Sequence, residues 1–98
     1  MSNVILINPF EVPKGKEEEC LQMWERGAEY LKKQPGYINT KLHQSMLPDS
    51  KFHFVNVAEW ETPEAFFKAV QSEEFLKIVE GSMDAYPHYP CLYTIIRN

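Results

Sequence analysis

The segment "FHFVNVAEW", residues 52–60, alternates between two sets of side chains and therefore predicts a β-strand with two distinct faces. One face carries mostly large apolar groups: Phe52, Phe54, Asn56, Ala58 and Trp60. The opposite face carries His53, Val55, Val57 and Glu59. The first face suits a hydrophobic core, but an amide in a core costs about 1–3 kcal/mol when it has no hydrogen-bond partner. Asn56 therefore needs a partner, which can be another protein group, water or a ligand.

The rest of the chain alternates between strand and helix patterns in the order β-α-β-β-α-β. Strands are expected at 3–10, 37–45, 51–60 and 91–97, and helices at 16–34, 61–72 and 72–83. Pro9 is expected to stop the first strand, and Pro35 with Gly36 to end the first helix. Thr62 and Ser72 are expected to cap the two later helical segments, which break near Gln71.

This order is that of the split-βαβ, ferredoxin-like fold, so we expect one α+β domain over residues 1–98. Its four-stranded antiparallel sheet carries the helices on one face, with the first and third strands adjacent at the centre. The other face is then bare and largely apolar, with Ile5, Ile7, His53, Val55, Val57, Tyr93 and Ile95 on it. A bare apolar face marks an interaction surface, so we expect a homodimer whose two sheets pack face to face.

Composition excludes several classes of function. The net charge of −4 and the absence of a long basic run argue against nucleic acid as a partner. The N-terminal "MSNVILINPF" has no basic region and too short an apolar run for a signal peptide or membrane span. Cys20 and Cys91 lack zinc-binding spacing, so we expect no metal and two reduced thiols in a cytoplasmic protein.

The same alternation applied to the first strand places Asn8 on the face that carries Asn56 and Trp60. Two amides and a tryptophan on one concave face favour a pocket between sheet and helices. The alternative is structural: each amide bonds to backbone or water, and Trp24 and Trp60 are core residues. The residues alone leave both readings open.

Local sequence suggests no nucleophile–base arrangement and no phosphate-binding loop. His43 and His53 have the parity of the bare face, and His88 lies in the proline- and tyrosine-rich segment 84–90.

Nearly the whole chain resembles the antibiotic biosynthesis monooxygenase family of dimeric α+β barrels. The most specific features are Pro35-Gly36 after the first helix, the Asn-x-x-x-Trp of the third strand, and the Trp-x-x-Pro-Glu-Ala-Phe that starts at Trp60. The resemblance implies a ferredoxin-like fold, a homodimer whose sheets form a barrel, and an active-site cleft between sheet and helices.

Some members of this family are cofactor-independent oxygenases that convert anthrones to quinones. The resemblance implies that Asn56 and Trp60 line the substrate pocket, and we expect catalytic roles for them and for Asn8. We expect substrate contacts from the aromatic residues Phe66, Trp24, Phe54 and Phe75. The family pattern has a tyrosine where this chain has Phe66, which can pack against a ring but cannot hydrogen-bond to it.

Other members degrade haem with a strand asparagine, a strand-end tryptophan and a helix histidine. Asn8 and Trp60 match the first two, but Val79 stands where the histidine is expected. We therefore expect a monooxygenase that oxidises a small aromatic or phenolic substrate with O2 and without a cofactor. The alternatives are a non-catalytic or non-oxidative barrel that binds a small ligand, and haem binding through another residue such as His88.

Overall fold

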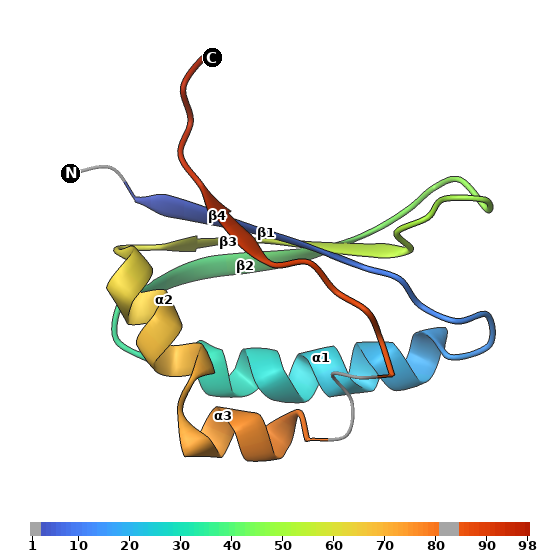
Figure 1. Ribbon diagram of the computed structural model, residues 1–98, viewed down its shortest axis with the longest axis horizontal. Coiled ribbons are helices and arrows are strands. Elements are labelled where there is room, and N and C mark those ends of the chain that lie inside the picture. The colour runs from blue at the N-terminus through green and yellow to red at the C-terminus, as the bar shows by residue number, and fades with distance from the viewer. Residues whose placement is uncertain (1–2, 81–84) are drawn as a thin grey trace.

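A four-stranded antiparallel sheet with all three helices on one side forms the protein (Figure 1). The computed structural model describes residues 3–80 and 85–98. The elements in chain order are β1 (Val4–Phe10), α1 (Glu17–Leu31), β2 (Tyr37–Gln44), β3 (Phe54–Trp60), α2 (Pro63–Val70), α3 (Glu73–Ile78) and β4 (Cys91–Tyr93). The sheet order β2-β3-β1-β4 confirms the predicted ferredoxin-like arrangement with β1 and β3 at the centre.

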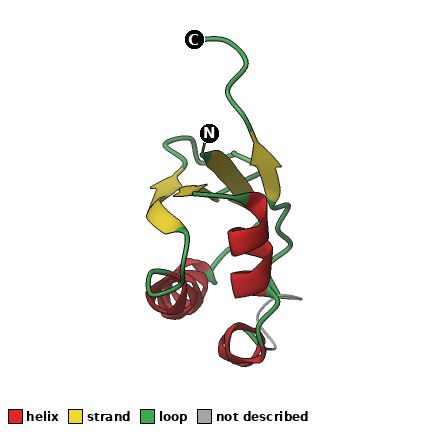
Figure 2. Cartoon of the chain, turned by 90° about the vertical axis from the view of Figure 1, so that its left-hand side faces the viewer, coloured by secondary structure: helices red, strands yellow, loops and turns green. Residues whose placement is uncertain are grey.

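The end-on view separates the two layers and shows the chain after β4 leaving the sheet on the side away from the helices (Figure 2). No helix within residues 3–80 and 85–98 combines the length and the apolar character needed to span a membrane.

Side chains of β3 alternate between the two faces, as predicted. Those that point toward the helices are buried, namely Phe54, Asn56, Ala58 and Trp60, and those between them are only partly buried. The β1–β3 register pairs Leu6 with Ala58, Asn8 with Asn56, and Phe10 with Phe54. The two asparagines are therefore directly opposite each other, with apolar rows on both sides of them.

Pro9 does not stop β1, contrary to the prediction, because its missing donor faces away from β3. The carbonyl of Pro9 accepts a hydrogen bond from the backbone N–H of Tyr89 at 3.1 Å. The nitrogen and carbonyl of a strand residue point to the same side, so the ring nitrogen of Pro9 also faces the 86–90 segment. No hydrogen bond to β3 is lost, and the strand continues to Phe10.

Strand β2 contains a register shift that alternation alone does not predict. Between Tyr37 and Asn39 the pairing with β3 slips by one residue, so Tyr37 is opposite Trp60 and Thr40 is opposite Ala58. Ile38, expected to share a face with Thr40 and Leu42, is exposed instead.

The last strand is shorter than expected, ending at Tyr93 rather than at residue 97. Its pairing with β1 runs from Ile7–Cys91 to Ile5–Tyr93, and β1 begins one residue before Ile5. Residues 95–97 therefore extend beyond the end of their partner strand. β3 likewise begins at Phe54 rather than at residue 51.

Both predicted caps of the second helical region are present. The Thr62 hydroxyl accepts from the N–H of Ala65 at 3.1 Å, and the Ser72 hydroxyl accepts from that of Phe75 at 3.2 Å. These caps divide the region into α2 and α3. The expected helix reached residue 83, but α3 ends at Ile78, and residues 81–84 lie outside the described part of the chain.

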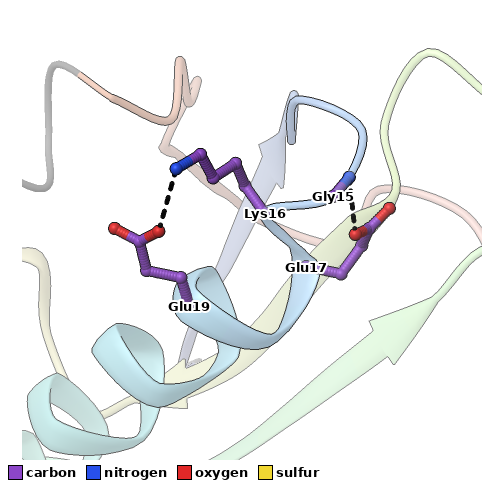
Figure 3. A network of polar contacts seen from close by, with 4 residues as sticks. All are labelled: Gly15, Lys16, Glu17 and Glu19. Atoms are coloured by element: carbon purple, nitrogen blue, oxygen red, sulfur yellow. Dashed lines mark hydrogen bonds and ion pairs between the residues drawn. The ribbon is translucent and has the colours of Figure 1, made fainter.

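Helix α1 begins with three glutamates, which the helix dipole favours at this end. Figure 3 shows two of them, Glu17 and Glu19, with their polar contacts. The Glu17 carboxylate accepts from the N–H of Gly15 at 3.0 Å, and Lys16 lies 3.5 Å from Glu19. The Lys16–Glu19 pair is well exposed, so it contributes little to stability. The acidic run is thus a solvated helix start and no part of a site.

Gly36 fixes the turn from α1 into β2 through two independent requirements. Its φ of +90° lies in the left-handed region, and a Cβ at this position would overlap the Cβ of Ala65 in α2. The Gly36 carbonyl also accepts from the N–H of Glu61 at 2.8 Å. The Pro-Gly motif therefore allows α2 to pack closely on the start of β2.

Replacing Gly36 with alanine should lower the free energy of unfolding more than the same change at Gly15. Gly15 also has φ +90°, but a Cβ there would meet nothing within 4 Å. We expect Gly15→Ala to cost about 1–2 kcal/mol from backbone strain. Gly36→Ala should cost a further 1–3 kcal/mol, roughly, from overpacking against Ala65. Urea denaturation measures both, and equal losses would contradict the proposed packing role.

Candidate active site

A pocket of about 630 Å³ lies between the sheet and the helical layer. Its floor is the buried face of the sheet, and its walls come from α1, α2, α3 and the 86–92 segment. Most lining residues are apolar or aromatic, and the volume is in the range of pockets that enclose a small organic molecule.

The amides of Asn8 and Asn56 form the centre of the pocket floor. The Thr40 hydroxyl donates to Asn56 Oδ1 at 2.7 Å and so fixes the orientation of that amide. The Asn56 Nδ2 group has no acceptor within residues 3–80 and 85–98. It can therefore donate to a molecule in the pocket.

Asn8 offers the complementary group. Its Oδ1 atom is buried and has no hydrogen-bond donor among the residues that the structure describes. A buried acceptor without a partner costs about 1–3 kcal/mol. A ligand hydroxyl could donate to Asn8 Oδ1 while it accepts from Asn56 Nδ2, so the two amides together match a phenolic oxygen.

Trp60 anchors an aromatic wall beside the amides. It is only 1% exposed and makes edge contacts with Tyr37 and Phe66, at centroid distances of 5.6 and 5.7 Å. All three side chains line the pocket. Because Trp60 is almost fully enclosed in the core, only a small part of its indole borders the pocket, and that part is held rigidly.

The other residues predicted to contact substrate divide into two groups. Trp24 and Phe75 line the pocket together with Phe66. Phe54 does not line it and packs instead in the core with Phe10 and Met23.

Tyr37 and Thr40 are among the lining residues that were not predicted as site residues, and His88 was considered only as an alternative haem ligand. The bulge brings Tyr37 to the pocket face. The bond of Thr40 to Asn56 depends on the β2–β3 register, which the sequence did not predict. His88 belongs to an irregular segment that local patterns do not position.

The pocket does not fit haem held by a residue of the last helix. Val79, at the position expected for the histidine ligand, is a buried apolar residue that lines the pocket at the end of α3. Among residues 3–80 and 85–98, no three His, Cys, Asp or Glu side chains gather as a metal site.

Cys20 is unsuited to act as a nucleophile. Burial, with a smaller effect of the Glu19 charge, raises the pKa of this thiol to about 11. Cys20 therefore stays a neutral core thiol near pH 7.

The sheet, helical layer and enclosed pocket define a class of protein: ferredoxin-like α+β domains with a site between sheet and helices. The sequence profile of the antibiotic biosynthesis monooxygenase family matches residues 3–81. This chain belongs to that family.

Solved structures agree with this assignment. A candidate monooxygenase from Shewanella loihica PV-4 is 34% identical over 99% of this chain and 97% of its own, with a TM-score of 0.86. SnoaB, a cofactor-independent oxygenase from Streptomyces nogalater, is 24% identical over 100% of this chain and 97% of its own, with a TM-score of 0.84. The second likeness shows a shared fold. A comparison with curated proteins yields no match.

Replacing each amide with leucine should separate a functional asparagine from a structural one. Asn8→Leu removes a buried acceptor that lacks a partner, so we expect the free energy of unfolding to stay level or rise by about 1 kcal/mol. Asn56→Leu leaves the Thr40 hydroxyl without its acceptor, so it should lose about 1–3 kcal/mol. Urea denaturation of both variants tests this. A large loss for Asn8→Leu would mean that Asn8 serves the fold.

Proposed function

We propose that this protein is a cofactor-independent monooxygenase that oxidises a small aromatic, phenol-like substrate with O2. The observation that carries the proposal is the pairing of Asn8 and Asn56 on the floor of a largely apolar pocket. One amide has a free donor and the other a buried acceptor without a partner. Membership of the antibiotic biosynthesis monooxygenase family supports the same chemistry.

In the proposed reaction the ionised substrate reduces O2 directly. A ring methylene becomes a carbonyl, one oxygen atom of O2 enters the product, and the other leaves as water. Asn56 Nδ2 donates to the substrate oxyanion, and the apolar walls keep out water that would weaken this interaction. The indole of Trp60 and the ring of Phe66 hold the substrate ring in place.

The two alternatives fit the geometry less well. A non-catalytic or non-oxidative barrel that binds a small apolar ligand would satisfy both amides internally, whereas Asn8 Oδ1 has no partner in the described structure. Haem binding through α3 lacks a ligand at Val79, and a haem titration followed by its Soret shift tests binding through His88 instead.

Anthrone and hydroquinone substrates should cause O2 uptake by the metal- and flavin-free protein, with one O2 consumed per anthrone methylene that becomes a carbonyl. Asn56→Ala should lower kcat by about 10²-fold, the typical effect of losing one oxyanion donor. Asn39→Ala is the matched control, because Asn39 is exposed on β2 and bonds to Glu59 outside the pocket. Uptake no faster than the uncatalysed rate across the panel would refute the proposal, as would equal effects of the two variants.

We further propose that the protein is a homodimer formed through the sheet face opposite the helices. Ile5, Ile7, Val55 and Val57 lie on that face and are only partly buried in the single chain. Tyr93, Ile95 and Ile96 are 49%, 70% and 75% exposed on β4 and the segment after it. A second copy would remove these apolar side chains from water.

A charge placed at the centre of this face should abolish the dimer. Val57 is opposite Ile7 on β1 and Lys41 on β2. In the monomer, the carboxylate of Val57→Glu therefore lies beside the ammonium group of Lys41, which favours its tolerance by the fold. Light scattering should give twice the 11.5 kDa chain mass for the unmodified protein and 11.5 kDa for the variant. Leu76→Glu, on the exposed side of α3, should remain dimeric. A monomeric parent protein would contradict the proposal.

A further inference from the structure

His88 is held on the pocket face of the sheet by a continuation of the β1–β4 pairing. The pairs Ile5–Tyr93 and Ile7–Cys91 belong to β4, and an isolated bridge between Phe10 and His88 keeps the same register. Paired residues in an antiparallel sheet point to the same face. Phe10 points toward the helical layer, and His88 accordingly lines the pocket.

The backbone around His88 is fixed on both sides. The N–H of Glu11 donates to the carbonyl of Pro87 at 2.8 Å, and the N–H of Tyr89 donates to that of Pro9 at 3.1 Å. The imidazole stacks on Phe10 with a centroid distance of 5.5 Å and an interplanar angle of 22°. The ring therefore has a defined position at one end of the amide floor.

One hydrogen bond also fixes which ring nitrogen carries the proton. His88 Nδ1 lies 2.9 Å from the carbonyl oxygen of Tyr86. A carbonyl only accepts, so Nδ1 carries the hydrogen and Nε2 of the neutral ring carries a free lone pair. The imidazole thus has the tautomer that a proton acceptor at Nε2 requires.

The pocket holds no competing base near neutral pH. Its lining includes no carboxylate, lysine or arginine within the described residues, and its titratable members are Tyr37, His88 and Cys91. Burial raises the pKa of Tyr37. Cys91 is paired with Ile7, so its side chain is on the opposite face of the sheet.

We propose that His88 is the general base that ionises the phenolic substrate. The step rests on the proposed oxidation, in which the substrate must be an anion before it reduces O2. The substrate O–H turns from Asn8 Oδ1 to His88 Nε2. Its O–H bond breaks as a bond forms between that hydrogen and Nε2, and the electron pair stays on the substrate oxygen. Asn56 Nδ2 then donates to this oxyanion, and the imidazolium returns its proton when water leaves.

Spacing along the sheet supports this role. Asn8 and Phe10 are two residues apart on one strand, or about 7 Å. His88, opposite Phe10, is thus a diagonal neighbour of Asn8, at about 7–8 Å. That separation allows a hydroxyl held beside Asn8 to contact the imidazole. Asn56 is on the other side of β1, about 10 Å across the sheet from the line of His88, so its amide approaches the same oxygen from the opposite side.

The titratable groups around the segment that carries His88 are few. Tyr89 bonds to the Glu11 carboxylate, and Tyr86 lies close to Glu19 and Cys20 of α1. None of these five residues lines the pocket.

Anaerobic binding of a nitrophenol tests the base without any oxygenase activity, because its neutral and ionised forms absorb at different wavelengths. We expect the protein to bind it mainly as the phenolate at a pH where most of the free ligand is neutral. His88→Gln should bind a several-fold smaller fraction in the ionised form. His43→Gln is the matched control: His43 Nδ1 also bonds to a carbonyl two residues earlier, that of Lys41, but His43 lies outside the pocket. Equal ionised fractions in His88→Gln and the parent, or no binding by the parent, would overturn the proposal.

Kinetics provide the second measurement. The parent kcat/KM should depend on pH, because only a neutral imidazole can accept the proton, and His88→Gln should be about 10²–10⁴-fold slower and lack this dependence. A substrate already ionised at the assay pH should restore most of the rate, and so should added imidazole with His88→Ala. If the parent is active and the pH profile of His88→Gln is the same as that of the parent, the proposed role of His88 is refuted, but the proposed oxidation is not. A parent inactive on every substrate would refute the proposed oxidation, while the nitrophenol result would still decide whether His88 takes the proton.

Discussion

The β1–β3 register places Asn8 directly opposite Asn56, and the pocket depends on this pairing. A shift of β1 by one residue would turn Asn8 to the bare face and bring an apolar side chain opposite Asn56. The rows on both sides, Leu6–Ala58 and Phe10–Phe54, favour the observed register because they bury apolar side chains under the helices. The hydrophobic core thus determines where the polar groups meet, although the amides themselves do little to stabilise it.

Three other parts of the site surround the Asn8–Asn56 pair. Thr40 on β2 engages the carbonyl of Asn56 and leaves its donor free, while Trp60 and Phe66 form a rigid aromatic wall. His88 approaches from the β4 side with its lone pair fixed by a backbone carbonyl. The unpartnered oxygen of Asn8 lowers stability, as is common where a protein holds a polar group ready for a ligand. We infer that the hydrogen bonds of the pocket floor are complete only when a phenolic oxygen binds to the two amides.

Period-two alternation was sufficient to predict that Asn8, Asn56 and Trp60 share a face, and helix chemistry was sufficient to locate the caps at Thr62 and Ser72. These features depend on neighbours in the chain. The bulge in β2, the Thr40–Asn56 bond and the position of His88 depend on pairing between distant segments, which local patterns do not encode. Phe54 illustrates the limit: its face was predicted correctly, but the side chain packs in the core beside the pocket and does not line it. The early end of β4 also depends on a distant segment. Tyr93 pairs with Ile5, and β1 begins at Val4, so residues after 94 have no strand to pair with.

A crystal structure with an anthrone-type phenol bound under anaerobic conditions tests the central claim most directly. The account predicts one ligand oxygen within about 3.2 Å of both Asn8 Oδ1 and Asn56 Nδ2, with the ring against Trp60. A ligand seated on the opposite sheet face would contradict it. So would a ligand in the pocket whose oxygens all point away from the two amides.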